Sequence, residues 1–537
     1  MSKRIYTVLL TLISLFVVIG CAKKGSITGG PKDETPPVFI KALPPNYSTN
    51  FNKKEIRIYF DEYIKLKDPQ KQIIISPPMD PKPTITPLGG PDKYIKINFQ
   101  DTLLENTTYS INFGESIVDN NEENPYPYFS YVFSTGDFLD SLSIKGVVAD
   151  AILKKPDSYI TVALYEVDEN YTDSLLYKEV PRYITNTLDS TAFNLYNLRK
   201  GKYKLVALKD ASSNYLFEPK QDKIGFYSEF VNLPEDTAKV FDLKLFKEVL
   251  DFKAFTPKQA SKNEIIFPYQ GKKDSMKIRL LSDAPDTLET RIFPFKDKDT
   301  LRYWFRPFFK ADSLVFEITN SKNYSDTLVT RFKDMYKDSL LLNSETKSIL
   351  DLNKSFILSA NTPLDSIKKD FIKLTDKDTL DVPFTIALDR FKNEAELVFE
   401  KTEENKYKLE FLPEAIKDYV GNVNDTVQFK FATKKLADYG TIFLTLQNVK
   451  AYPVLVQLTD KNEKVVVEKV AISDETIVFD HLDPAKYFIR IVFDTNENGV
   501  WDAGNFLKGM QPEEVKYFPE EIDVRANWEI KQTFILE

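Results

Sequence analysis

Apolar and polar residues alternate with a period of two along much of this 537-residue chain. Clear examples are Glu55–Phe60, Tyr203–Leu208 and Gln428–Phe431. Such alternation is typical of strands that bury one face and expose the other to water. Convincing helical periodicity is nearly absent, so the pattern predicts an all-β protein. The 28 tyrosines and 40 phenylalanines supply large apolar side chains for several β-sandwich cores.

The N-terminus departs from this alternation. A continuous apolar run over residues 8–20 follows Ser2-Lys3-Arg4 and ends at Cys21, the single cysteine of the chain. A basic start and a run of this length are typical of a secretory signal and short for a membrane span. Val18-Ile19-Gly20-Cys21 is similar to the lipobox of bacterial lipoproteins, which implies cleavage before Cys21 and acylation of its thiol, for example with palmitate.

We therefore expect a signal peptide at residues 1–20 and a lipidated flexible tether, rich in glycine and proline, at residues 21–35. The alternative is a plain N-terminal anchor helix with an incidental cysteine. The lipoprotein interpretation implies that the mature chain is attached to the outer membrane by acyl chains.

Several segments after the tether occur in an order known from one protein family. They are Pro36-Pro37, Leu43-Pro44-Pro45-Asn46, Ile58–Ile64, Asn106–Phe113, Ile117-Val118-Asp119 and Tyr131–Gly136. As a set they resemble the bacterial Ig-like domain of the surface-layer-protein type, which implies a β-sandwich at residues 36–137. A weaker copy implies a second Ig-like domain at residues 345–436, on the basis of Tyr407-Lys408-Leu409, Ile416–Asn422 and Phe429–Thr433.

A second internal repeat is clearer. The segment Leu195–Asp210 aligns without a gap on Phe479–Asp494, and the register continues until Glu218 meets Asp502. Self-similarity of this kind indicates two copies of one structural unit. The pattern of a strand, a polar turn, Lys-Tyr and a strand ending in Asp resembles the transthyretin-like or carboxypeptidase-regulatory-like β-sandwich. This resemblance implies copies at residues 138–248 and 438–537.

Residues 250–340 belong to no recognisable family, but strand patterns at Met276–Leu280 and Leu314–Ile318 suggest a further sandwich. The predicted fold class is therefore all-β, a tandem array of Ig-like and transthyretin-like β-sandwiches behind a lipoprotein signal peptide.

Charge and histidine content exclude several function classes. The 72 Lys and Arg residues are interspersed with 80 Asp and Glu residues, which argues against a nucleic-acid partner. With Cys21 acylated, the mature chain has no thiol, and His481 is its one histidine. His481 aligns with Asn197 in a turn of the other repeat, so we interpret it as a turn residue. His-containing zinc clusters and Ser-His-Asp triads lack their components, and we predict no enzyme activity.

One loop has the spacing of a calcium site. In Asp494–Asn505, the oxygen-bearing side chains of Asp494, Asn496, Asn498 and Asp502 occupy loop positions 1, 3, 5 and 9, with glycine at position 6. The bidentate glutamate expected at position 12 is missing, because Asn505 stands there. The alternative is a turn stiffened by Asx hydrogen bonds and held in the core by Trp501. The paired loop Asp210–Glu218 keeps fewer of these oxygen ligands, and there we favour a purely structural turn.

A short motif is over-represented. Asp followed by Ser or Thr and then by an aliphatic residue, Met or Thr occurs fourteen times, where composition alone would give about two or three. The sites begin at Asp101, Asp140, Asp173, Asp189, Asp236, Asp274, Asp286, Asp299, Asp312, Asp326, Asp338, Asp365, Asp378 and Asp425. The motif is similar to the O-glycosylation acceptor sequence of Bacteroidota. Such sequences are also good strand entries, and both interpretations are compatible.

Together these features predict a non-enzymatic outer-membrane lipoprotein that acts as a multi-domain scaffold or accessory subunit of a cell-envelope complex, with an envelope protein as partner. The first alternative is a surface carbohydrate-binding lipoprotein, with Trp304 and Trp501 as candidate stacking platforms. For these two tryptophans, burial in a core is the competing explanation. A third hypothesis is a glycan-active enzyme. The membrane face is open: we favour the surface, although Lys23 and Lys24 stand where surface-exported lipoproteins often carry acidic residues.

Overall fold

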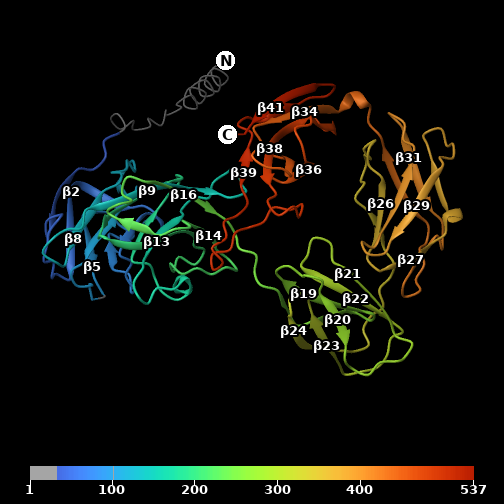
Figure 1. Cartoon of the computed structure of the whole chain (residues 1–537), viewed down its shortest axis with the longest axis horizontal. Helices are drawn as coiled ribbons and strands as arrows, with labels where there is room; N and C mark the ends of the chain where they lie inside the picture. Colours follow the sequence, from blue (N-terminus) through green and yellow to red (C-terminus); the bar gives the residue numbers. More distant parts are fainter. Residues whose placement is uncertain (1–32, 101, 537) are drawn as a thin grey trace, which may run out of the picture. The chain divides into compact units, whose positions relative to one another are not determined.

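The computed structural model describes residues 33–100 and 102–536. The signal, Cys21 and most of the tether lie outside the described residues. The described chain forms two compact units: one extends to Ser141 and includes residues 196–198, and the other contains residues 142–195 and continues from residue 199. Strands dominate both units, which confirms the all-β prediction (Figure 1). Among the described residues, no helix has the length and hydropathy needed to cross a membrane.

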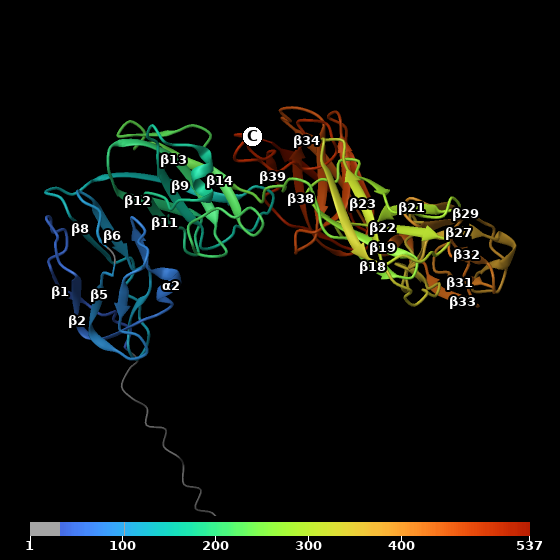
Figure 2. The same ribbon diagram turned by 90° about the horizontal axis from the view of Figure 1, so that it is seen from below.

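The first sandwich consists of two antiparallel sheets, with strand order β1-β2-β5-β4 plus β7 in one and β3-β6-β8 in the other (Figure 2). Its elements are β1 (Phe39–Leu43), β2 (Glu55–Leu66), α2 (Pro69–Gln72), β3 (Ile74–Ser76), β4 (Thr84–Thr86), β5 (Asp92–Asn98), β6 (Thr108–Asn112), β7 (Ile117–Asp119) and β8 (Ser130–Ser134). The period-two pattern explains the core: Ile56, Ile58 and Phe60 are at most 2% exposed, whereas Arg57 and Tyr59 between them face outward.

The next sandwich, here called the first repeat, has sheets β12-β9-β16 and β11-β10-β13-β14, with β15 also paired to β13. Its elements are β9 (Leu142–Asp150), β10 (Thr161–Glu166), η1 (Asp173–Tyr177), β11 (Tyr183–Asn186), β12 (Ala192–Leu198), β13 (Gly201–Lys209), β14 (Lys223–Phe226), β15 (Val231–Leu233) and β16 (Val240–Leu245). Its last strand, β16, runs parallel to its first strand, β9.

The C-terminal sandwich, here called the second repeat, has the same arrangement, with sheets β37-β34-β41 and β36-β35-β38-β39, and with β40 paired to β38. Its elements are η3 (Leu436–Asp438), β34 (Gly440–Gln447), β35 (Val454–Thr459), β36 (Val465–Ala471), β37 (Ile477–Leu482), β38 (Ala485–Phe493), β39 (Val515–Tyr517), β40 (Ile522–Val524) and β41 (Glu529–Ile535). Here too the last strand, β41, is parallel to the first, β34.

The strand registers of the two repeats correspond. Gly201 pairs with Leu233 in the first repeat, and the aligned Ala485 pairs with Val524 in the second. The repeats also share a local backbone feature, because Asn197 near the end of β12 and His481 near the end of β37 both have left-handed backbone, with φ of 58° and 52°. His481 lies within β37, where the pairing with β34 shifts register, so it belongs to an irregular strand end rather than to the turn that the alignment predicted. Asparagine tolerates this conformation better than most residues.

Two further sandwiches lie between the repeats in sequence. The middle sandwich has sheets β17-β19-β22-β21 plus β18, and β20-β23-β24. Its strands are β17 (Lys253–Ala254), β18 (Lys258–Ser261), β19 (Glu264–Gln270), β20 (Lys277–Leu280), β21 (Glu289–Pro294), β22 (Thr300–Arg306), β23 (Ser313–Thr319) and β24 (Ser325–Arg331). A core that includes Phe267 and Phe316 closes between its sheets.

The following sandwich has sheets β25-β26-β30-β29, β27-β32 and β28-β31-β33. Its elements are β25 (Leu342–Ser344), β26 (Phe356–Ala360), β27 (Leu364–Ile367), η2 (Lys369–Phe371), β28 (Ile372–Thr375), β29 (Phe384–Asp389), β30 (Glu394–Phe399), β31 (Lys406–Phe411), β32 (Ile416–Asp418) and β33 (Val427–Ala432).

This sandwich repeats the turn chemistry of the first one. The Thr135 hydroxyl accepts the Thr107 amide N–H at 2.9 Å, and the Thr433 hydroxyl accepts the Asn405 N–H at 3.1 Å. The last residue of β7 and of β32 is a buried Asp that accepts several loop N–H groups. Asp119 accepts four, and Asp418 accepts two together with an Asn side chain. These matching contacts support the resemblance of the two Ig-like segments at the level of individual bonds.

Candidate functional site

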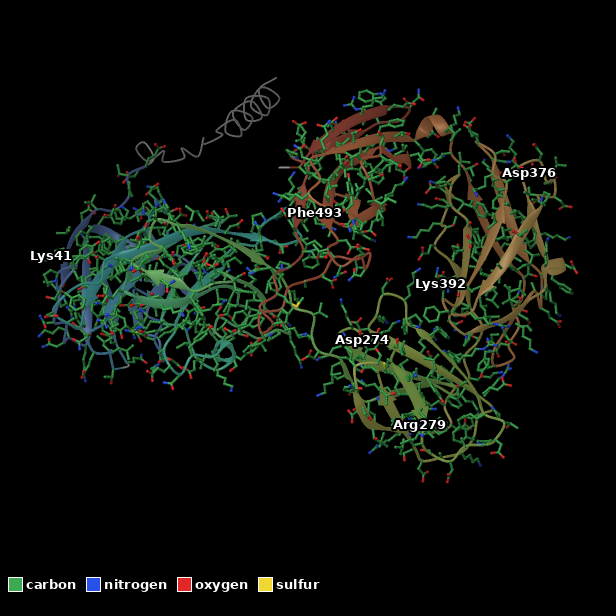
Figure 3. All side chains as sticks on the ribbon, in the orientation of Figure 1. Lys41, Asp274, Arg279, Asp376, Lys392 and Phe493 are labelled. Carbon is green, nitrogen blue, oxygen red and sulfur yellow. The ribbon has the colours of Figure 1, made fainter. Side chains whose placement is uncertain are left out.

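The predicted calcium loop begins where β38 ends, directly after Phe493, which is labelled in Figure 3. Asp494 is 4% exposed, and its two carboxylate oxygens accept the backbone N–H groups of Asn498 at 3.0 Å and Gly499 at 2.7 Å. Gly499 has φ of +77°, a conformation that favours glycine and bends the chain back over the carboxylate. The first half of the loop is therefore an Asx-type turn closed on Asp494.

The second half of the loop converges on Asp502. The side-chain amides of Asn496 and Asn498 both donate to its Oδ2, the former at 2.7 Å, and Lys272 of the middle sandwich binds its Oδ1 at 2.7 Å. Burial alone would raise the pKa of Asp502, but the bonds from Lys272 and the two amides outweigh it and lower the pKa. The fold thus brings the four predicted residues of this loop together.

A third carboxylate, which the sequence analysis missed, closes the base of the loop. Glu513 is 8% exposed, and its Oε1 accepts the Thr495 N–H at 2.8 Å while its Oε2 accepts the Asp502 N–H at 3.0 Å. Asn505, at position 12, is not part of this cluster and instead pairs with Met510. Glu513, eleven residues beyond Asp502, therefore fastens the two ends of the loop.

The first repeat explains why Glu513 is there. Asp222, fully buried, accepts the N–H groups of Ala211 and Glu218, which align with Thr495 and Asp502. Asp222 and Glu513 are thus equivalent residues that fasten the two ends of the same loop. The equivalence of Asp222 and Glu513 could have been found from the sequence by extending the repeat alignment past Glu218 with a gap. Three residues separate Glu218 from Asp222, whereas ten separate Asp502 from Glu513.

The paired loop in the first repeat has the structure of a turn without the ligand set. Asp210 accepts the N–H of Tyr215 at 2.7 Å, and Tyr215, aligned with Gly499, has the same left-handed backbone with φ of 62°. A tyrosine in this conformation is uncommon, and it contributes no oxygen to the loop centre. This loop keeps the turn geometry of its partner and the amide at position 5, Asn214, but has Ser212 in place of the amide at position 3.

The donor set of the second loop has the chemistry that calcium prefers, because carboxylate and amide oxygens from Asp494, Asn496, Asn498, Asp502 and Glu513 lie within one short segment. In this structure each of these side chains accepts or donates hydrogen bonds inside the loop or to Lys272. Over the described residues, no group of three or more His, Cys, Asp or Glu side chains is placed to hold a metal ion. Calcium binding therefore stays a prediction, and hydrogen bonds alone account for the turn.

A cavity of about 710 Å³ adjoins the loop. It is lined by Asn496, Asn498 and Asp502 and by residues of the middle sandwich that include Asp274, labelled in Figure 3, and Asn323. Lys272, Lys322 and Lys508 balance the carboxylates of Asp251, Asp274 and Asp502 around it. Its amide groups and charged side chains supply hydrogen-bond donors and acceptors, and the formal charges of these lysines and aspartates cancel.

The candidate stacking platforms have different environments. Trp304 is 1% exposed and packs in a small cluster with Phe293 of its own sandwich and Tyr419 of the following one, apart from the core between the sheets. Burial is therefore confirmed for Trp304, and the stacking hypothesis for it is wrong. Trp501 is partly exposed, and its indole N–H donates to the carbonyl of Glu513 at 3.2 Å, which ties it to the base of the candidate loop.

Comparison with known proteins gives one family match. Residues 33–135 match the sequence model of the bacterial Ig-like domain. This confirms the Ig-like resemblance for the first sandwich, and the match covers less than a fifth of the chain. No curated protein matches the chain.

Solved structures match only loosely. SGBP-B of the Bacteroides ovatus mixed-linkage glucan utilization locus, in complex with a mixed-linkage heptasaccharide, is 11% identical, with a TM-score of 0.19 over 72% of this chain and 91% of that one. The insect immune protein hemolin is 11% identical (TM-score 0.18, 73% and 99%). The Bacillus anthracis TIE protein is 12% identical (TM-score 0.14, 100% and 79%). Likeness at these TM-scores carries no argument about function, and the candidate loop lies outside the Ig-like match.

Proposed function

We propose that this protein is a non-enzymatic lipoprotein of the outer membrane that acts as a scaffold or accessory subunit of a cell-envelope complex. The observation that carries the proposal is the serial arrangement of five β-sandwiches, among which one unit occurs twice and Ig-like chemistry recurs. Repeated sandwiches supply extended surface and defined spacing, which suits holding and positioning. The lipobox-like segment before Cys21 supports attachment to the membrane by acyl chains.

The anchor is tested by metabolic labelling with an alkyne-palmitate analogue. The wild-type chain should carry label and fractionate with outer membranes, and the Cys21→Ser variant should lose the label. A Ser26→Ala variant in the same tether is the matched control and should behave as wild type. Unchanged labelling of Cys21→Ser would remove the lipoprotein component of the proposal.

The scaffold role is tested by purification of the tagged chain from outer membranes solubilised in mild detergent. We expect one defined envelope protein to co-purify in a constant ratio, in reciprocal experiments with either partner tagged. Recovery of the chain alone under these conditions would count heavily against a scaffold. Protease treatment of intact cells then tells whether the sandwiches face the medium, as we favour, or the periplasm.

A second candidate, polysaccharide capture, is favoured by the cavity beside the candidate loop, because amides and charged pairs bind vicinal hydroxyl groups. Its residues Asn323, Asn496 and Asn498 are exposed. The burial of Trp304 removes one of its two proposed stacking residues. A glycan array without binding would exclude this candidate.

A further inference from the structure

The ten residues between Asp502 and Glu513, which we call the insertion hairpin (residues 503–512), are seven more than the equivalent stretch of the first repeat contains. They fold back on themselves: Asn505 and Met510 exchange two backbone hydrogen bonds of 2.8 and 2.9 Å around a turn in which Gly509 has φ of +63°. The base of the hairpin is fastened by Glu513, so its position follows from the core of the second repeat. An addition of this size on one copy requires an explanation.

The hairpin carries a buried aromatic residue at an otherwise exposed place. Phe506 is 1% exposed, while its neighbour Leu507 is 56% exposed. The Phe506 ring packs edge-on against Phe226 of the first repeat, with centroids 5.2 Å apart, and its backbone N–H donates to the Glu248 carboxylate at 2.5 Å. Burying an aromatic ring and satisfying its backbone at once is typical of the centre of a specific interface.

Neighbouring residues adapt the hairpin to the same surface. Gly504 lies so close to the first repeat that a Cβ on it would stand 2.5 Å from the ring of Phe246, which leaves no room for another residue. The side chain of Gln511 donates to the carbonyl of Phe226 at 2.9 Å and to the hydroxyl of Ser228 at 3.0 Å.

A separate set of contacts joins the same two sandwiches. The Glu463 carboxylate of the second repeat accepts the backbone N–H groups of Lys154 and Lys155 at 2.8 and 3.0 Å. The hydroxyl of Tyr517 and the guanidinium of Arg490 both donate to the carbonyl of Ile152, at 2.7 and 3.1 Å. Arg490 is 4% exposed, so this contact is buried and hydrogen-bonded.

We propose that the insertion hairpin is an intramolecular docking element that joins the two repeats into one cooperative body, although about 190 residues separate them in sequence. The surface that receives it is formed by Phe226, Phe246, Glu248 and Ser228 of the first repeat. Because this body is closed, the two sandwiches at residues 250–433 are attached to it at both ends. The scaffold is then a base formed by the two joined repeats, which presents the two sandwiches between them in sequence. The first repeat lacks the insertion hairpin because it supplies the surface that receives it.

The test is a cysteine cross-link in a chain of residues 22–537, which lacks the signal and Cys21 and so contains no native cysteine. Gln511 Nε2 donates to Ser228 Oγ at 3.0 Å, so Ser228→Cys and Gln511→Cys bring two thiols to the two sides of the same contact. Under mild oxidation we expect an intramolecular disulfide, detected as faster migration on a non-reducing gel and by mass spectrometry. A Ser228→Cys, Leu380→Cys pair, with Leu380 exposed in another sandwich, is the control and should not form an intramolecular disulfide.

Side-chain removal then tests the hairpin itself. Phe506→Ala in the double-cysteine chain should slow disulfide formation by at least about tenfold, whereas Leu507→Ala on the same hairpin should leave the rate unchanged. Circular dichroism shows whether each variant keeps its β structure, and Gln511→Ala in an otherwise native chain should make the Phe226 region more exposed in hydrogen exchange. No disulfide in the folded chain, a disulfide only between two chains, or equal rates for Phe506→Ala and Leu507→Ala would overturn the proposal. None of these readouts involves a membrane or a partner, so they are independent of the proposed function.

Discussion

Trp304 offers a quantitative test of whether an aromatic residue here serves packing or recognition. Its side chain is almost completely buried, against Phe293 and Tyr419. A buried tryptophan removes about 200 Å² of apolar surface from water, which at about 25 cal/mol per Å² corresponds to about 5 kcal/mol. Large-to-alanine substitutions in cores cost about 3–5 kcal/mol, so Trp304→Ala should lower the free energy of unfolding by about 4 kcal/mol.

Phenylalanine should behave differently at this position. The indole N–H of Trp304 is buried and has no hydrogen-bond partner in the structure, and a buried unsatisfied donor costs about 1–3 kcal/mol. Trp304→Phe removes that donor along with part of the ring, and the two effects oppose each other. We expect the Phe variant to lie within about 1 kcal/mol of wild type.

Urea unfolding followed by circular dichroism measures both changes. With a slope of about 2 kcal/mol per M, the transition that reports on this sandwich should move down by about 2 M in Trp304→Ala. The control is Trp528→Ala, because Trp528 is 51% exposed and should shift unfolding by less than about 0.5 kcal/mol. If Trp304→Ala unfolds like wild type, or loses glycan binding while remaining stable, the packing argument is refuted.

Three further outcomes are expected. Four loop N–H groups hold the pKa of Asp119 below its usual value despite burial. The contribution of Asp119 to the free energy of unfolding is therefore present above the unfolded-state pKa and is lost as the pH falls. In urea titrations, Asp119→Ala should cost about 2 kcal/mol at pH 7 and progressively less below about pH 4. If the candidate loop binds calcium, Trp501 should sensitise terbium emission that Asp494→Ala abolishes and Asp210→Ala leaves intact; no emission from wild type would favour the turn alone. Mass spectrometry of the exported protein should find glycans on Ser or Thr of the Asp-Ser/Thr sites. None of these acceptor residues is buried, and Thr327 is an exposed example. Unmodified peptides throughout would support the strand-entry explanation.

The loops of the two repeats show which residues of the candidate site the spacing of residues along the chain can predict. Positions 1, 3, 5 and 9 place Asp494, Asn496, Asn498 and Asp502 in one loop, and the structure does gather them. Glu513 could not be added from spacing, because its distance along the chain depends on the length of the insertion hairpin. Its role became visible through the equivalent Asp222, whose contacts with Ala211 and Glu218 are the same.

The sequence by itself determined the all-β class, because period-two alternation acts over a few neighbouring positions. Its motifs also carried the resemblance of the first sandwich to the bacterial Ig-like domain. Only the tertiary structure decided which aromatic residues are buried, since Trp304 and Phe506 are enclosed by residues far away in the chain. Composition cannot separate a core aromatic from a binding platform, because both need the same side chain and differ only in what covers it. Burial is a property of the packed chain. Here it places Trp304, a candidate recognition residue, in a buried cluster, and it is the basis on which the insertion hairpin is proposed as a docking element.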